Sequence, residues 1–231
     1  MKKTICRLAA TAAVLLGASL TVPATAAIVK IDGGQTSVAL DSDVLASVGL
    51  VIEGVSPDVI VPGNLGAGSV AFGINSRSAA APLLPTTFEF DSETFAPFSG
   101  AIEHLGSVFF VGGIEVGNFT IGFDPARVEA GLRSGFFVES TAGLAAILFD
   151  VGIPSALEFS STELTIAADL LVSSEFAAIL EQDVAGVDAG DALVEGRVPA
   201  PATLVLLGIG LAAGAGIRCR ALMPNSTHRQ S

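Results

Sequence analysis

Short apolar runs separated by Gly, Ser, Asp and Pro are the feature of this sequence that most restricts its fold. They follow one another from Ile28 to about Ala168, at the spacing typical of strands joined by turns. We therefore expect a mainly β domain, either an antiparallel sandwich or an open barrel. The strongest candidate strands are Val51–Val55, Ser69–Ile74, Thr87–Phe90, Ser99–His104, Ser107–Val111, Glu115–Phe123, Gly135–Glu139, Ala145–Val151 and Glu163–Ala168.

Two segments depart from the strand pattern and are expected to be short helices packed on the sheet. The first, Ser42–Val48, has Asp41 or Ser42 as its N-cap, and the second, Ser173–Gln182, has Ser174 in that position. Side-chain oxygens of Asp and Ser accept hydrogen bonds from the free N–H groups at the start of a helix, which makes both residue types frequent there.

Three further stretches are expected to be irregular. Residues 75–85 are rich in Ser, Ala and Pro and predict an exposed loop, and Gly66–Ser69 predicts a turn. Residues 183–197 alternate acids with Gly and Ala and lack large aromatic side chains, which favours an acidic flexible stalk. The expected β-rich domain therefore spans residues 27–182.

A hydrophobic core, without disulfide bonds, has to hold this domain together. Cys6 and Cys219 are the two cysteines and both lie outside the domain, whereas the chain contains 14 Phe and no Trp or Tyr. Phe119, Ile121 and Phe123 alternate with Thr120 and Gly122. This period of two predicts a strand with one face in the core.

The charge of the middle region excludes one class of partner. All 23 acidic residues lie between Asp32 and Glu195. A strongly negative surface repels phosphate backbones, so nucleic-acid binding is not expected. Only five of the 11 basic residues lie between residues 27 and 197: Lys30, Arg77, Arg127, Arg133 and Arg197.

The N-terminus has the order of elements found in a secretory signal peptide. Basic residues at positions 2, 3 and 7 flank the start of the apolar segment Leu8–Leu20, and Ala24 and Ala26 supply the small side chains that signal peptidase recognises. Cleavage is expected after Ala26, and the domain that follows is expected to be exported.

A second apolar segment lies near the C-terminus. Residues 198–217 are uncharged and are followed by Arg218 and Arg220. A helix of this length covers about 30 Å, the thickness of the hydrocarbon core of a bilayer, and the basic residues place its far end inside the cell. A buried core helix is the alternative, but the glycines at positions 208, 210, 214 and 216 are more typical of a membrane span.

This segment resembles the PEP-CTERM sorting signal of bacterial exported proteins. Val198-Pro199-Ala200-Pro201 precedes the apolar helix, and Arg218 and Arg220 form the basic cluster after it. The resemblance implies an exosortase-type membrane protease as the processing partner. Ala200 occupies the position where the family usually has Glu, and residues 221–231 extend the tail. The helix is therefore expected either to be cleaved or to stay as a single-pass anchor.

A second resemblance covers most of the middle region. Ser99–Gly106, Val116–Ile121, Ile147–Asp150 and Ser174–Leu180 resemble, in order, motifs of a secreted β-rich domain of bacterial surface proteins that includes haem-uptake domains of the HtaA type. The haem proteins of that family rely on tyrosine, which this chain lacks, so no cofactor is expected. His104 matches a position of interest and is the one candidate ligand.

Catalytic and zinc sites find little support in the residues. The chain has no G-x-S-x-G elbow, and His104 and His228 are its two histidines, so a serine-hydrolase triad could be built only on His104. A lone histidine beside Glu103 near a strand end is more typical of a surface or turn residue. One histidine without cysteine does not supply a zinc ligand set, and no metal site is predicted.

Two carboxylate clusters have the alternate spacing that calcium ligands can have. Neither is accompanied by an EF-hand or a calcium-binding repeat, so solvated acidic faces are the favoured interpretation. The clusters are Asp41 with Asp43, and Glu89 with Asp91 and Glu93.

Together these features predict an exported surface or extracellular-matrix-associated protein without catalytic activity, held in the membrane by its C-terminal helix. The alternative is an extracytoplasmic binding module for polysaccharide, Ca²⁺ or a haem-like cofactor, and an enzyme comes third. The expected partners are the membrane, the processing protease and extracellular polysaccharide.

Overall fold

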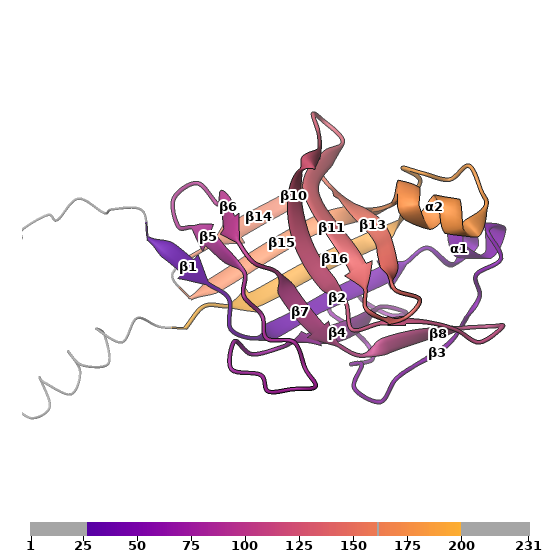
Figure 1. Cartoon of the computed structure of the whole chain (residues 1–231), viewed down its shortest axis with the longest axis horizontal. Helices are drawn as coiled ribbons and strands as arrows, with labels where there is room; N and C mark the ends of the chain where they lie inside the picture. The colour runs from indigo at the N-terminus through magenta and orange to yellow at the C-terminus, as the bar shows by residue number, and fades with distance from the viewer. Residues whose placement is uncertain (1–26, 161, 200–231) are drawn as a thin grey trace, which may run out of the picture.

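Strands β2 (Gly34–Leu40) and β16 (Asp188–Arg197) lie side by side although most of the chain separates them (Figure 1). A computed structural model describes residues 27–160 and 162–199. In it the strand order β13-β11-β10-β7-β4-β2-β16-β15 closes on itself because β13 also pairs with β15. The other strands of this barrel are β4 (Val70–Ile74), β7 (Ile102–Leu105), β10 (Thr120–Glu129), β11 (Arg133–Ser140), β13 (Ala146–Gly152) and β15 (Glu163–Val172).

The closure of the barrel corrects part of the expected fold class. The mainly β, antiparallel architecture is confirmed, and each of the candidate strands overlaps an observed strand. The barrel is closed, however, and is neither a sandwich nor open. Strand β15 makes the closure because its first half pairs with an extra strand, β14 (Ala156–Phe159), and its second half pairs with β13.

Strand β16 also corrects the prediction of a stalk. Residues 188–197 form the longest ladder in the molecule, with β15 on one side and β2 on the other. Their acids face outward, whereas Ala189, Ala192 and Val194 are buried. The prediction was wrong because the frequent acids and small residues suggested flexibility, but a barrel wall needs only one apolar face.

Two smaller sheets flank the barrel. The four-stranded one, which we call the small sheet, has the order β12-β9-β8-β3, and its residues Val108, Phe110 and Val116 line the barrel interior. The three-stranded sheet has the order β1-β5-β6. The bounds are β12 (Ala142–Gly143), β9 (Ile114–Gly117), β8 (Ser107–Phe110), β3 (Ile52–Val55), β1 (Ile28–Lys30), β5 (Glu89–Asp91) and β6 (Pro97–Ser99).

Both predicted helices are present, at the end of the barrel away from the chain ends (Figure 1). Helix α1 (Ser42–Ser47) has Asp41 as its N-cap, whose carboxylate accepts hydrogen bonds from two backbone N–H groups of the first turn. Helix α2 (Ser174–Leu180) has Ser173 as its N-cap, not Ser174. The Ser173 hydroxyl, which is buried, accepts from the N–H of Phe176.

Phenylalanine fills much of the interior, as the composition predicts. Phe72 and Phe119 meet edge to face with their ring centroids 4.8 Å apart, and a second group of rings lies near the three-stranded sheet. Ile121 is buried, and Phe119 and Phe123 pack against the core, which confirms the core role expected from their alternation. The second group consists of Phe88, Phe90, Phe95, Phe136 and Phe159.

Candidate functional site

His104 points into the barrel interior from β7. Its side chain is buried, and its Nδ1 lies 2.8 Å from the carbonyl oxygen of Phe119 while its Nε2 lies 2.7 Å from the hydroxyl of Thr36. A carbonyl oxygen can only accept, so Nδ1 carries the proton and Nε2 accepts from Thr36. Burial lowers the pKa of His104 to about 4 and keeps the ring neutral at pH 7.

This environment corrects the expectation of a surface or turn histidine and limits what His104 can do. Neither ring nitrogen contacts a carboxylate among the described residues, so no catalytic triad is assembled on it. Both nitrogens already have partners, which leaves no lone pair ready to ligate a metal. From inside the barrel, His104 joins β7 to Thr36 of β2 and to Phe119, the residue before β10.

An apolar cavity of about 60 Å³ lies next to His104 inside the barrel. Thr36 and His104 carry the only polar side chains among the residues that line it. Binding pockets for drug-sized ligands are several times larger, about 300 Å³ or more, so a porphyrin does not fit. With no tyrosine in the chain and no free nitrogen on His104, a haem-like cofactor does not fit these residues.

A larger recess of about 270 Å³ lies beside β7, under the segment that joins β4 to β5. We call it the Glu103 recess. Residues 75–85, part of which border the recess, form an irregular and largely exposed loop, as predicted. The recess combines apolar and polar side chains. The recess is lined by Asn75, Pro82, Leu83, Leu84, Glu103, His104, Asn118 and Thr141.

Two asparagines are held in fixed orientations at this recess. The Nδ2 group of Asn75 donates to the carbonyl oxygen of Leu84 at 2.9 Å, and the Oδ1 atom of Asn118 accepts from the N–H of Gly106 at 3.3 Å. Because the role of each backbone partner is fixed, the orientation of each amide is fixed as well. This leaves one acceptor, Asn75 Oδ1, and one donor, Asn118 Nδ2, without a hydrogen bond to any described residue.

Glu103 supplies a second acceptor. Its Oε2 accepts from the hydroxyl of Thr120 at 2.7 Å, and its Oε1 has no partner among the described residues. Burial raises the pKa of Glu103, the nearby charge of Glu139 raises it further, and the hydrogen bond from Thr120 offsets part of this. The recess therefore presents one donor and two acceptors, one of them on a carboxylate that is costly to keep charged.

The carboxylate clusters singled out in the sequence have structural roles. Asp41 caps α1, Glu89 pairs with Lys30 and Arg77, and Asp91 accepts from the turn that follows it. The backbone N–H groups of this turn lower the pKa of Asp91. Within the described ranges, no group of three or more His, Cys, Asp or Glu side chains is arranged to hold a metal ion.

The predicted targeting residues lie mostly outside the described part of the chain. This applies to the signal-peptidase site at Ala24 and Ala26, to Ala200 and Pro201 of the sorting motif, and to the basic pair at positions 218 and 220. Val198 follows β16 directly, and its N–H donates to the carbonyl oxygen of Thr162 at 2.8 Å. None of the helices in residues 27–199 has the length and apolarity to cross a bilayer.

Comparisons with known proteins found a distant structural similarity. No family model matches the chain, and no curated protein matches it. One similar solved structure is the C-terminal domain of HtaA from Corynebacterium glutamicum. The identity is 15%, the TM-score is 0.45, and the match covers 74% of this chain and 99% of that domain. At this level of similarity the match says nothing about ligands.

Sequence reasoning selected His104 but missed the recess beside it. The recess joins residues from four places in the chain: the loop after β4, strand β7, the turn before β10 and Thr141 between β11 and β12. Asn118 was the one residue of the recess whose type could have predicted its turn. Asn tolerates the left-handed backbone that this turn requires, with φ of 46°. The spatial meeting of Asn75, Glu103 and Asn118 depends on strand pairing and could not be read from their spacing.

Proposed function

We propose that the chain is an exported surface or matrix-associated protein that binds a short neutral saccharide, without catalysis, in the Glu103 recess. The proposal rests mainly on three polar atoms at one recess that have no hydrogen-bond partner among the described residues: Asn75 Oδ1, Asn118 Nδ2 and Glu103 Oε1. A sugar hydroxyl both donates and accepts, so neighbouring hydroxyls match a set of one donor and two acceptors.

The rest of the recess supports the same class of ligand. Pro82, Leu83 and Leu84 offer an apolar side against which the C–H groups of a sugar ring can pack. The strong excess of acidic residues disfavours anionic polymers. Non-catalytic binding is favoured because the one described histidine is neutral and fully hydrogen-bonded.

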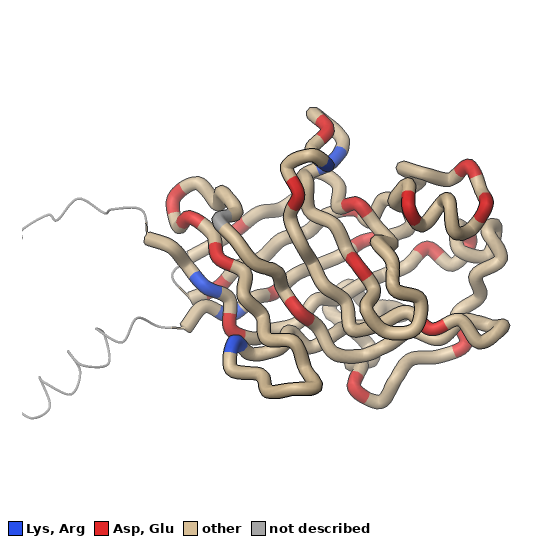
Figure 2. Tube along the Cα trace, viewed as in Figure 1, with Lys and Arg blue, Asp and Glu red and all other residues tan. Residues whose placement is uncertain are grey.

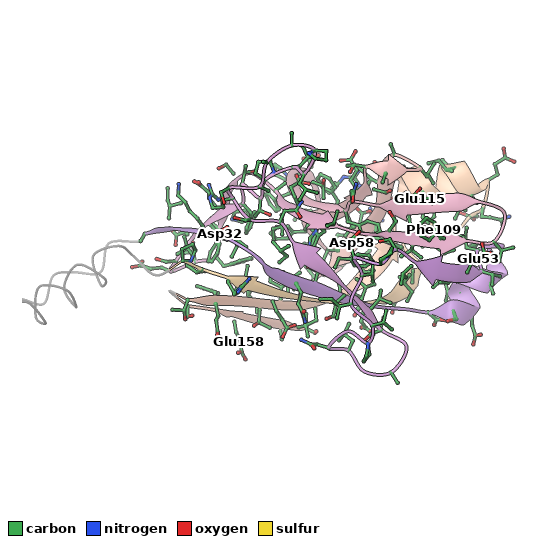
Figure 3. The ribbon with its side chains drawn as sticks, turned by 90° about the horizontal axis from the view of Figure 1, so that it is seen from below. Asp32, Glu53, Asp58, Phe109, Glu115 and Glu158 are labelled. Atoms are coloured by element: carbon green, nitrogen blue, oxygen red, sulfur yellow. The ribbon has the colours of Figure 1, made fainter. Side chains whose placement is uncertain are left out.

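Sugar binding can be tested on the full chain in phosphatidylcholine nanodiscs. Amide resonances would be followed while neutral mono- and disaccharides are titrated. We expect shifts confined to the recess, and we expect Asn118→Ala and Glu103→Gln each to weaken binding about two- to tenfold, the effect of one lost hydrogen bond. Glu158→Gln, on exposed β14 (Figure 3), is the matched control. Unchanged affinity in both recess variants would overturn the assignment.

Export and sorting are a separate part of the proposal and need a separate test. The intact mass of the protein recovered from membrane and medium fractions of its native host reports both ends of the chain. A species that begins near Ala27 and ends between Val198 and Pro201 supports sorting and release. An uncut C-terminus found only in membranes would leave a single-pass anchored protein and would count against cleavage by an exosortase-type protease.

A further inference from the structure

The outer face of the small sheet presents an aromatic ring between carboxylates. Phe109 of β8 lies directly opposite Glu115 of β9, so both side chains project from the same face. The alternate residues Val108 and Phe110 line the barrel interior, so Phe109 and Glu115 face away from the core. Figure 3 labels Phe109, Glu115 and Glu53 on the three adjacent strands β8, β9 and β3.

Strand β3 leaves space beside this ring. Gly54 is the residue of β3 that pairs with Phe109, and a Cβ added to Gly54 would meet no atom within 4 Å. Within the described residues β3 pairs only with β8, so its other edge is open. Val51 precedes β3 and Val111 follows β8; a backbone hydrogen bond joins them, and they are 51% and 58% exposed. The face thus combines a free strand edge with exposed apolar side chains.

The charge of this face is of one sign. Glu53 lies on β3 and Glu115 on β9, and the small sheet itself carries no Lys or Arg. In Figure 2 the basic residues of the described chain lie on other parts of the barrel, whereas the end with β3, β8 and the helices shows acidic residues only. One carboxylate oxygen of Glu115 accepts from the Ser107 hydroxyl at 2.7 Å, and the other is left for a ligand.

We propose that this face docks an extended segment of a partner protein in which Lys or Arg alternates with apolar residues. The segment adds to the open edge of β3 by main-chain hydrogen bonds. A cationic side chain crosses the gap above Gly54 onto the Phe109 ring and is neutralised by Glu53 and Glu115, since aromatic faces attract cations. Apolar residues of the segment contact Val51 and Val111.

This docking surface is independent of saccharide binding. The small-sheet face and the Glu103 recess share no residue, so the failure of one proposal leaves the other intact. The probe is a fluorescein-labelled hexapeptide of alternating Lys and Val. Its anisotropy is measured with the full chain in phosphatidylcholine nanodiscs, and empty nanodiscs give the background.

Three variants test the geometry. Phe109→Ala should weaken peptide binding about fivefold through loss of the cation–π contact. Gly54→Val fits a strand and meets open space, so the protein should stay folded while the new side chain blocks the ring and weakens binding about tenfold. Glu115→Gln should weaken binding and reduce its salt dependence. Glu158→Gln on β14 is the control and should bind the peptide as the wild type does.

Two further peptides separate docking from general charge attraction. A Glu–Val peptide should not bind, and a Lys–Ser peptide should bind more weakly than Lys–Val. Equal binding of the Lys–Ser and Lys–Val peptides, or wild-type affinity in both Phe109→Ala and Gly54→Val, would show that an acidic surface attracts any cation and would overturn the proposal. Circular dichroism melting of each variant establishes that loss of binding is not loss of fold.

Discussion

The hydroxyl of Thr36 donates a 2.7 Å hydrogen bond to Nε2 of His104 inside the barrel. These two side chains are the polar ones at an otherwise apolar cavity, and they join β2 to β7 although the two strands are not neighbours in the barrel. The bond satisfies a nitrogen that has no access to water. A proton added to Nε2 would therefore break this bond and destabilise the barrel.

Replacement of Thr36 by Val should destabilise the fold. The change keeps the volume of the side chain but leaves a buried acceptor on His104 without a donor, which costs about 1–3 kcal/mol. Thr36→Ser keeps the hydroxyl and is the matched control. The free energy of unfolding of the full chain would be measured by urea titration in mild detergent. Equal stability of the Val and Ser variants would contradict the role assigned to this bond.

Acid should weaken the protein through His104. Its pKa is lowered from 6.5 to about 4 in the folded state, so the unfolded chain binds the proton more tightly. The stability contributed by the neutral ring is fully present above about pH 6.5 and is lost as the pH falls towards 4, by about 3 kcal/mol in total. His104→Gln should flatten this part of the curve of stability against pH. Parallel curves for the two proteins would contradict the prediction.

Loss of the Asp150 carboxylate should destabilise the protein far more than loss of the Glu175 carboxylate. Asp150 is 1% exposed and lies 2.7 Å from Arg127 Nη1 and 3.4 Å from Arg133 Nη1. Asp150→Asn leaves Arg127 and Arg133 without their shared buried partner and should cost about 3–5 kcal/mol. Arg127 also pairs with Glu175, whose side chain is 40% exposed, and Glu175→Gln should cost less than about 1 kcal/mol. The same urea titrations measure both, and similar costs would count against the burial argument.

Gly34 should not tolerate any side chain. An added Cβ would lie 2.1 Å from the carbonyl oxygen of Glu195 on β16, and its φ of +123° is one that other residues rarely adopt. Gly34→Ala should therefore cost at least about 2 kcal/mol. Gly73→Ala in β4 meets no atom within 4 Å at an ordinary strand conformation, and it should change stability by less than about 1 kcal/mol. Thermal unfolding of the two variants side by side checks this contrast.

The strands with apolar side chains were predictable because their alternation is strong and local. Residues 119–123 show this, since the large side chains at 119, 121 and 123 all pack in or against the core. Strand β16 was missed although it also alternates, because its inward residues are mostly Ala and Gly. Small residues suffice there because large ones on the facing strands fill the interior, and no local pattern reveals that.

The environment of His104 was unpredictable for a different reason. Glu103 and His104 are adjacent in sequence and both border the recess, but only His104 also lines the apolar cavity inside the barrel. Which of them is inside depends on the register of β7 with β4 and β10. A shift by one residue would exchange the two. The sequence alone does not specify that register.

The place of β16 at the end of the described chain has a consequence for biogenesis. If the chain is exported as proposed, β2 leaves the export channel long before residues 190–196, which are its partners on one side. The barrel therefore cannot close until the chain has passed through to Arg197, and contacts of such long sequence separation form slowly. Until then the apolar side of β2 is not covered by a closed barrel. After closure the N–H of Val198 is hydrogen-bonded to Thr162. A protease that cuts between residues 198 and 201 would therefore have to reach a bond directly beside the folded barrel.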